Sequence, residues 1–105
     1  MNTNTARELL NSTKDMIYKT APNMEPARGC ALALGILHYN ASTLAPEYGT
    51  EVVAEAQHMA NGSLLRACLT GQSQHEALLE GVGLTTEQYP FSDWDSYPAY
   101  EPVNA

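Results

Sequence analysis

The first apolar pattern of the chain has the spacing of a helix. Thr5 and Glu8 fit a capping box, in which two side chains hydrogen-bond the free amides at the start of a helix. Apolar residues then recur at helical spacing until Pro22. The members of this series are Ala6, Leu9, Leu10, Met16 and Ile17. The pattern predicts a helix over residues 6–20.

A second helix is predicted over residues 26–42, after the linker APNMEP. Pro26 suits the first position of a helix, where its missing amide hydrogen is not needed. Between Cys30 and Leu37 every residue is apolar or glycine, so this helix has almost no polar face. Its small residues would let neighbouring helices approach closely: Gly29, Ala33 and Gly35. These features predict that the second helix is the central, buried element.

A third apolar series begins after Pro46 and stays in helical phase across the Asn61-Gly62 pair. Its members are Val52, Val53, Ala56, Met59, Ala60, Leu64, Ala67 and Cys68. An Asn-Gly pair can also form a hairpin turn, but the flanking residues would then alternate with a period of two, and they do not. The series predicts one long helix over residues 46–70, weakened locally at Gly62.

A short helix is predicted last. Gly71 closes the long helix, Ser73 with Glu76 forms a second capping box, and the helix ends at Gly81. Together these patterns predict an all-α fold, a small bundle of three to four helices without strands. We expect a helical domain over residues 1–86 and an irregular acidic, aromatic tail over residues 87–105.

The length and composition favour one domain. With 105 residues, of which 44% are hydrophobic, the chain can bury one core. The run from Cys30 to Leu37 is far shorter than the roughly 20 residues that span a bilayer, so no membrane helix is expected.

The N-terminus lacks the basic start and apolar stretch of a secretory signal, which predicts a cytoplasmic protein. In that compartment Cys30 and Cys68 are expected to be packed thiols rather than a disulfide.

The net charge of −7 is unevenly distributed along the chain. Residues 1–66 hold six acids and five bases, whereas residues 67–105 hold six acids and no base. Direct binding to nucleic acid or to an anionic membrane relies on clustered Lys and Arg. The charge therefore argues against both.

No pattern for catalysis, metal binding or a cofactor stands out. The histidines His38, His58 and His75 lie 20 and 17 residues apart, which matches no local metal-ligand spacing. Cys30 lies in an apolar run, which should raise the pKa of its thiol and make it a poor nucleophile. The sequence GVG at 81–83 lacks the Lys and Ser or Thr of a phosphate loop. We therefore expect no enzyme, no metal and no cofactor.

Carboxylates recur every four residues on the predicted third and fourth helices: Glu47, Glu51 and Glu55, then Glu76 and Glu80. Like charges at this spacing destabilise a helix by about 0.2–0.5 kcal/mol per pair. The helix dipole offsets part of this near the helix starts, but not at Glu55 and Glu80. Two interpretations follow: a solvated acidic face without a partner, or a face that binds a basic partner.

The segment YPFSDWDSYPAYEP, residues 89–102, holds five of the eight aromatic residues with three acids, three prolines and no base. Large, stiff aromatic side chains dominate binding hot spots, which favours a partner-binding strip. Alternatively, Tyr89, Phe91 and Trp94 fold back and seal the bundle, or residues 89–94 dock while residues 95–105 stay free. The candidate partner-binding residues here are Tyr89, Phe91, Asp93, Trp94, Asp95, Tyr97, Tyr100 and Glu101.

These features predict a small acidic protein that binds the basic, nucleic-acid-binding surface of a host protein complex. In size and charge the chain is similar to small anti-defence inhibitors from phages and other mobile elements, including some anti-CRISPR proteins. This resemblance is one of composition and implies an inhibitor that acts in the host cytoplasm. It covers no motif.

Two other functions stay open at this stage. One is a helical adaptor, chaperone or antitoxin-like subunit that forms a homodimer or another oligomer through residues 26–42. The other is a small-molecule-binding helical protein, with a pocket in which His38, Tyr39 and Asn40 supply polar contacts.

Overall fold

The computed structural model describes residues 3–68 and 70–91, and every regular element in these ranges is a helix. The helices are α1 (Thr3–Thr20), α2 (Pro26–Tyr39), α3 (Ala41–Tyr48), α4 (Thr50–Ala67) and α5 (Gln72–Gly81). The predicted all-helical class is confirmed for this part of the chain. The predicted count of three to four helices is wrong, because five are present there.

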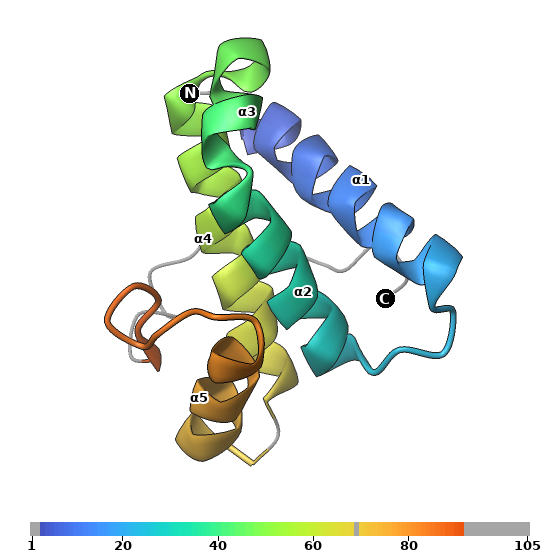
Figure 1. The fold of residues 1–105 in the computed structure, drawn as a ribbon, viewed down its shortest axis with the longest axis vertical. Coiled ribbons are helices and arrows are strands. Elements are labelled where there is room, and N and C mark those ends of the chain that lie inside the picture. The colour runs from blue at the N-terminus through green and yellow to red at the C-terminus, as the bar shows by residue number, and fades with distance from the viewer. Residues whose placement is uncertain (1–2, 69, 92–105) are drawn as a thin grey trace.

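Three helices form the body of the molecule. α1, α2 and α4 pack against one another, α3 lies on α4, and α5 contacts α2 (Figure 1). The predicted central position of α2 is confirmed, since eight of its 14 residues are buried. A Cβ atom built on Gly35 would lie 3.3 Å from the Val82 side chain, so a small residue there lets the chain after α5 approach α2 closely.

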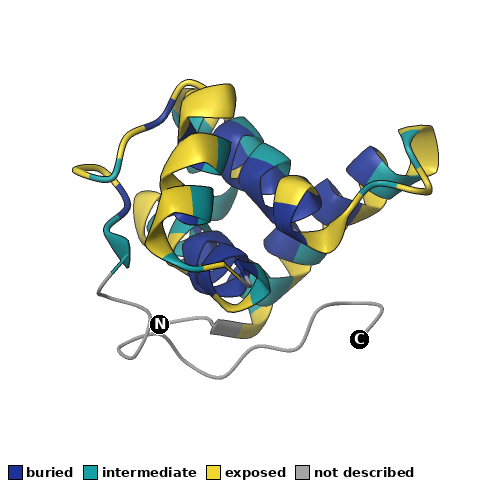
Figure 2. Cartoon of the chain, turned by 90° about the horizontal axis from the view of Figure 1, so that it is seen from below, coloured by how far each residue is buried: buried dark blue, intermediate teal, exposed yellow. Residues whose placement is uncertain are grey.

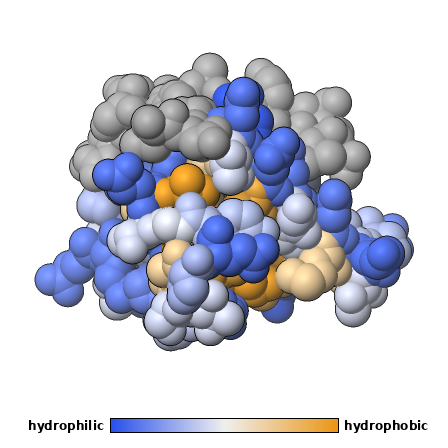
Figure 3. Space-filling view, turned by 90° about the horizontal axis from the view of Figure 1, so that it is seen from above, coloured by the Kyte–Doolittle hydropathy of each residue, from blue (hydrophilic) through white to orange (hydrophobic). Residues whose placement is uncertain are grey.

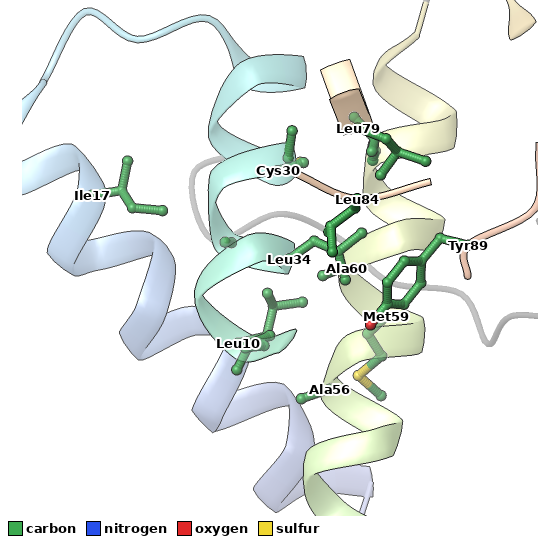
Figure 4. Close-up of a cluster of buried hydrophobic side chains, with 14 of the residues drawn as sticks. Leu10, Ile17, Cys30, Leu34, Ala56, Met59, Ala60, Leu79, Leu84 and Tyr89 are labelled. Atoms are coloured by element: carbon green, nitrogen blue, oxygen red, sulfur yellow. The ribbon is translucent and has the colours of Figure 1, made fainter. Parts of the chain in front are cut away.

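The core runs along the facing sides of these helices and continues into the chain after α5. Figure 2 shows buried residues where the helices meet, and buried positions again in the segment that follows α5. In Figure 4 the Tyr89 ring reaches from that segment toward Met59 of α4. The largest fully buried apolar side chains are Leu10, Leu34, Leu37, Met59, Leu64, Leu79 and Leu84.

The predicted long helix over residues 46–70 is interrupted at Gly49. This residue has φ 91° and ψ 144°, a conformation that glycine adopts far more readily than other residues. The chain turns back there, so that α3 packs along α4. Pro46 lies inside α3 and does not start a helix. The predicted helix start at Pro46 is therefore wrong, because Gly49, three residues later, separates the two helices.

The helix through Asn61 and Gly62 is confirmed. α4 continues without a break across the pair, and both residues are buried. No hairpin forms there. The predicted weak point is therefore an interior turn of the helix.

Both predicted capping boxes are wrong. α1 already includes Thr3, so Thr5 lies within the helix and does not cap it. α5 begins at Gln72, and its N-cap is Gly71 without a side-chain hydrogen bond. The Gln74 side chain instead accepts hydrogen bonds from the Thr70 amide at 3.0 Å and the Thr70 hydroxyl at 2.9 Å. This contact satisfies a free amide near the helix start without a Ser or Thr cap.

The predicted second helix is three residues too long. α2 ends at Tyr39, because Asn40 leaves the helical conformation with φ −104° and ψ 14°. The Asn40 side-chain amide donates a hydrogen bond to the Ile36 carbonyl at 2.9 Å. An asparagine side chain competes in this way with the helical backbone bonds.

Replacement of Gly49 by alanine should destabilise the fold by about 1–3 kcal/mol, because a side chain at this backbone conformation is strained. No atom lies within 4 Å of the added Cβ, so the loss would come from the backbone alone. Gly81→Ala is the matched control: its Cβ also meets nothing, but its φ is ordinary. Urea unfolding of both variants tests this, and an equal stability for the two would contradict the assigned role of Gly49.

Candidate functional site

Three predicted acidic residues lie together at one end of the molecule. Glu47 is on α3, whereas Glu51 and Glu55 lie one turn apart on α4. Glu47 and Glu51 are exposed, and Glu55 is partly buried. None of the three makes an ion pair or side-chain hydrogen bond with a residue in 3–68 or 70–91. We call Glu47, Glu51 and Glu55 the α3–α4 acidic patch.

Glu76 and Glu80 form a second group on α5, the α5 acidic patch. Both are exposed and, like the first group, unpaired within the described part of the chain. Figure 1 shows α3 and the start of α4 at one end of the long axis and α5 at the other end. The predicted acidic residues therefore form two patches, one at each end of the molecule.

Four of the five basic residues lie on helices that carry neither acidic patch. The first four are on α1 and α2, and the fifth is near the end of α4: Arg7, Lys14, Lys19, Arg28 and Arg66. α3 and α5 carry no base. The carboxylates of the two acidic patches make no ion pair with these bases in the described part of the chain, which leaves them available to another molecule.

Apolar side chains reach the surface beside the α3–α4 acidic patch. Leu44 and Tyr48 of α3 and Val52 of α4 are only partly buried, and α3 has no buried residue at all. Figure 3 shows the molecule from above, with hydrophobic atoms at separate places among hydrophilic residues. Apolar side chains among polar ones are usual in a protein-binding surface.

The start of the aromatic segment belongs to the core. Tyr89 is only 7% exposed and lies in the same apolar cluster as the helices. Its hydroxyl is 2.9 Å from Nδ1 of His38 on α2, and its ring meets the His38 ring edge-on at a centroid distance of 5.7 Å. The packing is that expected if this part of the segment seals the bundle.

Asn61 of α4 joins the segment to α5. Its amide nitrogen donates to the Pro90 carbonyl at 3.4 Å, and its amide oxygen is 2.9 Å from Nε2 of His75. Because a carbonyl only accepts, the amide nitrogen must face Pro90, and the amide oxygen must accept from His75. Nε2 of His75 therefore carries the hydrogen. The Phe91 ring covers the His75 ring at a centroid distance of 5.6 Å.

The rest of the aromatic segment lies outside the described residues. This applies to Asp93, Trp94, Asp95, Tyr97, Tyr100 and Glu101. Their role in partner binding stays a prediction. Tyr89 and Phe91 are packed on the helices, so any contact of theirs with a partner must be compatible with this packing or must displace it.

The two cysteines are buried free thiols, as predicted. Burial raises the pKa of Cys30, and a hydrogen bond from Lys14 and the charge of Lys14 reduce this effect only in part. Burial also raises the pKa of the Cys68 thiol, as does its interaction with Cys30. Both thiols thus stay protonated and buried, which makes them poor nucleophiles. The predicted rise in the pKa of Cys30 is confirmed.

The three histidines have different surroundings. In the described ranges, no group of three or more His, Cys, Asp or Glu side chains could hold a metal ion. His38 contacts Tyr89, His75 contacts Asn61, and His58 is exposed.

The side chains proposed to line a small-molecule pocket each have a partner within the protein. The Tyr39 hydroxyl donates to the Gly83 carbonyl, and the Asn40 amide donates to the Ile36 carbonyl. His38 lies against Tyr89. No observation therefore assigns these three side chains to one pocket.

The pair formed by Asn61 and His75 was not predicted from the sequence. A signal was present for both. Asn61 is a polar residue beside Ala60 and Leu64, within a helix that is mainly apolar at this point. His75 stands three and four residues before Leu78 and Leu79, which places it on the apolar side of α5.

No protein-family model, curated protein or solved structure matches this chain. Among the described helices, none combines the length and the apolar character that crossing a bilayer requires. The function must therefore be inferred from the residues and the geometry above.

Proposed function

We propose that this protein binds the basic, nucleic-acid-binding surface of a host protein complex and inhibits that complex. The observation that carries the proposal is the set of unpaired carboxylates on α3, α4 and α5, helices that hold a single base between them. A basic groove that normally holds phosphates would attract these carboxylates. Complementary charge raises the rate of association and selects the partner.

The arrangement of the two acidic patches supports an elongated contact. The patches lie toward opposite ends of the long axis, so a partner groove that contacts both must run along the length of the molecule (Figure 1). Leu44, Tyr48 and Val52 would add apolar contact at the α3 end. The charged residues would then speed association with the partner, and the apolar contacts would stabilise the complex.

The small size and acidic charge fit an inhibitor encoded by a phage or another mobile element and directed against a host defence complex. Oligomer formation through α2 has less support, because α1, α4 and α5 already contact this helix. The unpaired carboxylates favour a hetero-complex, since two copies of an acidic patch would repel each other.

Reversal of charge at either acidic patch should weaken partner binding by tenfold or more, because each variant replaces attraction with repulsion. The variants are Glu51→Lys with Glu55→Lys, and Glu76→Lys with Glu80→Lys. Glu8→Lys with Asp15→Lys is the matched control, because it makes the same change in net charge on exposed positions of α1. All three should stay folded, as judged by circular dichroism.

The experiment uses each variant as bait in nuclease-treated extract of the native host, with quantitative mass spectrometry of the captured proteins. The proposal predicts that the wild-type protein and the control capture the same nucleic-acid-binding complex, and that both patch variants lose it. Equal capture by all baits would contradict the proposal. So would equal loss with the control, since net charge rather than the patches would then determine binding.

A further inference from the structure

Residues 84–91, which we call the strap, are attached to three helices. Leu84 and Tyr89 are buried, at 1% and 7% exposure. The end of the strap has three polar or aromatic contacts: Tyr89 with His38 of α2, Pro90 with Asn61 of α4, and Phe91 with His75 of α5. Two of the three contacts involve a histidine ring.

The surroundings of His75 can accept only the neutral ring. Its Nε2–H donates to Asn61, and its Nδ1 is buried with no hydrogen-bond partner in the described ranges. A proton on Nδ1 would place a charge and an unpaired donor in a fully buried position, which is unfavourable. Burial accordingly lowers the pKa of His75 below the ordinary value of about 6.5 for histidine.

Within residues 3–68 and 70–91, no charged side chain shifts the pKa of His75, which burial alone lowers. Three titratable side chains on the surrounding elements are buried: Tyr89, which pairs with His38, and the thiols of Cys30 on α2 and of Cys68 at the C-cap of α4. The other titratable and charged side chains are exposed or only partly buried: Arg28, His38 and Tyr39 of α2, Glu51, Glu55, His58 and Arg66 of α4, Glu76 and Glu80 of α5, and Glu87 of the strap. The neutral groups against the imidazole are Asn61 and Phe91.

The contact between His38 and Tyr89 behaves differently. A tyrosine hydroxyl can donate to a neutral imidazole nitrogen or accept from a protonated one. This contact can therefore exist in both protonation states of His38. Of the two histidine contacts of the strap, the one between Tyr89 and His38 is therefore compatible with a neutral or a protonated ring. The one at His75 is compatible only with a neutral ring.

We propose that the end of the strap is an acid-released latch, in which protonation of Nδ1 of His75 detaches Pro90 and Phe91 from α4 and α5. Phe91 is partly exposed, and its ring contacts the His75 ring. Displacement of Phe91 would open one side of the His75 ring without separating any two helices, so a local opening is less costly than global unfolding. The inference concerns the isolated protein and does not depend on the proposed partner.

The direction of the pH effect follows from the lowered pKa. The closed form binds the proton less readily than the open form, so the latch is fully stable above about pH 6.5. Below that pH the ratio of open to closed latch rises, by up to about tenfold for each pH unit. The rise ends where His75 becomes protonated in the closed form as well.

NMR spectroscopy of the full chain between pH 8 and pH 5 tests the latch. At pH 8 we expect the ¹⁵N shifts of His75 to show the Nε2–H form, with proximity signals between the His75 and Phe91 rings. Toward pH 5 these signals and the protection of the Asn61 side-chain amide should be lost, while contacts between α1 and α2 remain. A hydrogen on Nδ1 at pH 8 would overturn the proposal. Simultaneous loss of the contacts between α1 and α2 would also overturn it.

A pair of variants assigns the effect to His75. His75→Gln can still donate to Asn61 but does not titrate, so its latch should stay closed at pH 5. His58→Gln changes an exposed histidine of α4 and should release the latch as the wild-type protein does. If His75→Gln does not fold, the wild-type titration alone decides, because the His75 ring signals and the Asn61 amide must change with the same midpoint. Release in His75→Gln with the wild-type pH dependence would contradict the assignment.

Discussion

A chain truncated after Gln88 is expected to be less stable than the full-length protein by about 3–5 kcal/mol. Burial of a large side chain such as Tyr89 contributes about 1.5–3 kcal/mol. The cut also leaves His38 and Asn61 without their partners on the strap, at a further cost of about 1 kcal/mol or more. A small domain has only about 5–15 kcal/mol in total.

Thermal unfolding followed by circular dichroism measures this loss, which should lower the melting temperature by 10 °C or more at about 4–8 °C per kcal/mol. A chain that ends at Phe91 is the control, because it keeps the contacts of Tyr89, Pro90 and Phe91 with His38, Asn61 and His75 and separates their effect from that of residues 92–105. Tyr89→Phe keeps the ring and removes the hydroxyl, so its loss should be only about 1 kcal/mol. If the chain that ends at Gln88 has the same melting temperature as the full-length protein, the strap does not seal the core.

Asn61→Leu is the second variant with a large expected effect, a loss of about 2–5 kcal/mol. Leucine has a similar size but leaves Nε2–H of His75 and the Pro90 carbonyl without partners. Each buried polar group left unpaired costs about 1–3 kcal/mol. The Asn61 side chain is fully buried, so water cannot replace it without disturbing the core.

The double variant Asn61→Leu with His75→Leu separates lost pairing from poor packing. Removal of both partners of a buried hydrogen bond is less harmful than removal of one, so the double variant should lose less than the sum of the single variants. Urea unfolding of the four proteins gives this coupling. Strict additivity would mean that Asn61 and His75 do not act as a pair.

The sequence predicted those parts of the fold that depend on local pattern. The position of α2 follows from its uninterrupted apolar run, and the continuity of α4 follows from the helical phase on both sides of Asn61. The break at Gly49 was missed because the glycine conformation there depends on α3 packing back onto α4, which no local pattern reports. The break at Gly49 explains why the structure has one helix more than predicted.

The candidate site was predicted in part. Exposure of Glu51 and Glu76 follows from their positions opposite the apolar stripes of their helices. Their distribution to opposite ends of the molecule depends on how α4 and α5 are placed, which the sequence did not indicate. The burial of Tyr89 could be stated only as one of two alternatives, because tyrosine suits both a core edge and a binding surface.

Displacement of nucleic acid from the captured complex tests the central claim most directly. The complex is loaded with a fluorescently labelled nucleic acid that it binds, and the protein is added while anisotropy is followed. The account predicts that the wild-type protein releases the nucleic acid, that Glu51→Lys with Glu55→Lys releases it at least tenfold less effectively, and that added salt weakens the effect. Binding of the protein to the complex with the nucleic acid still in place would contradict the account.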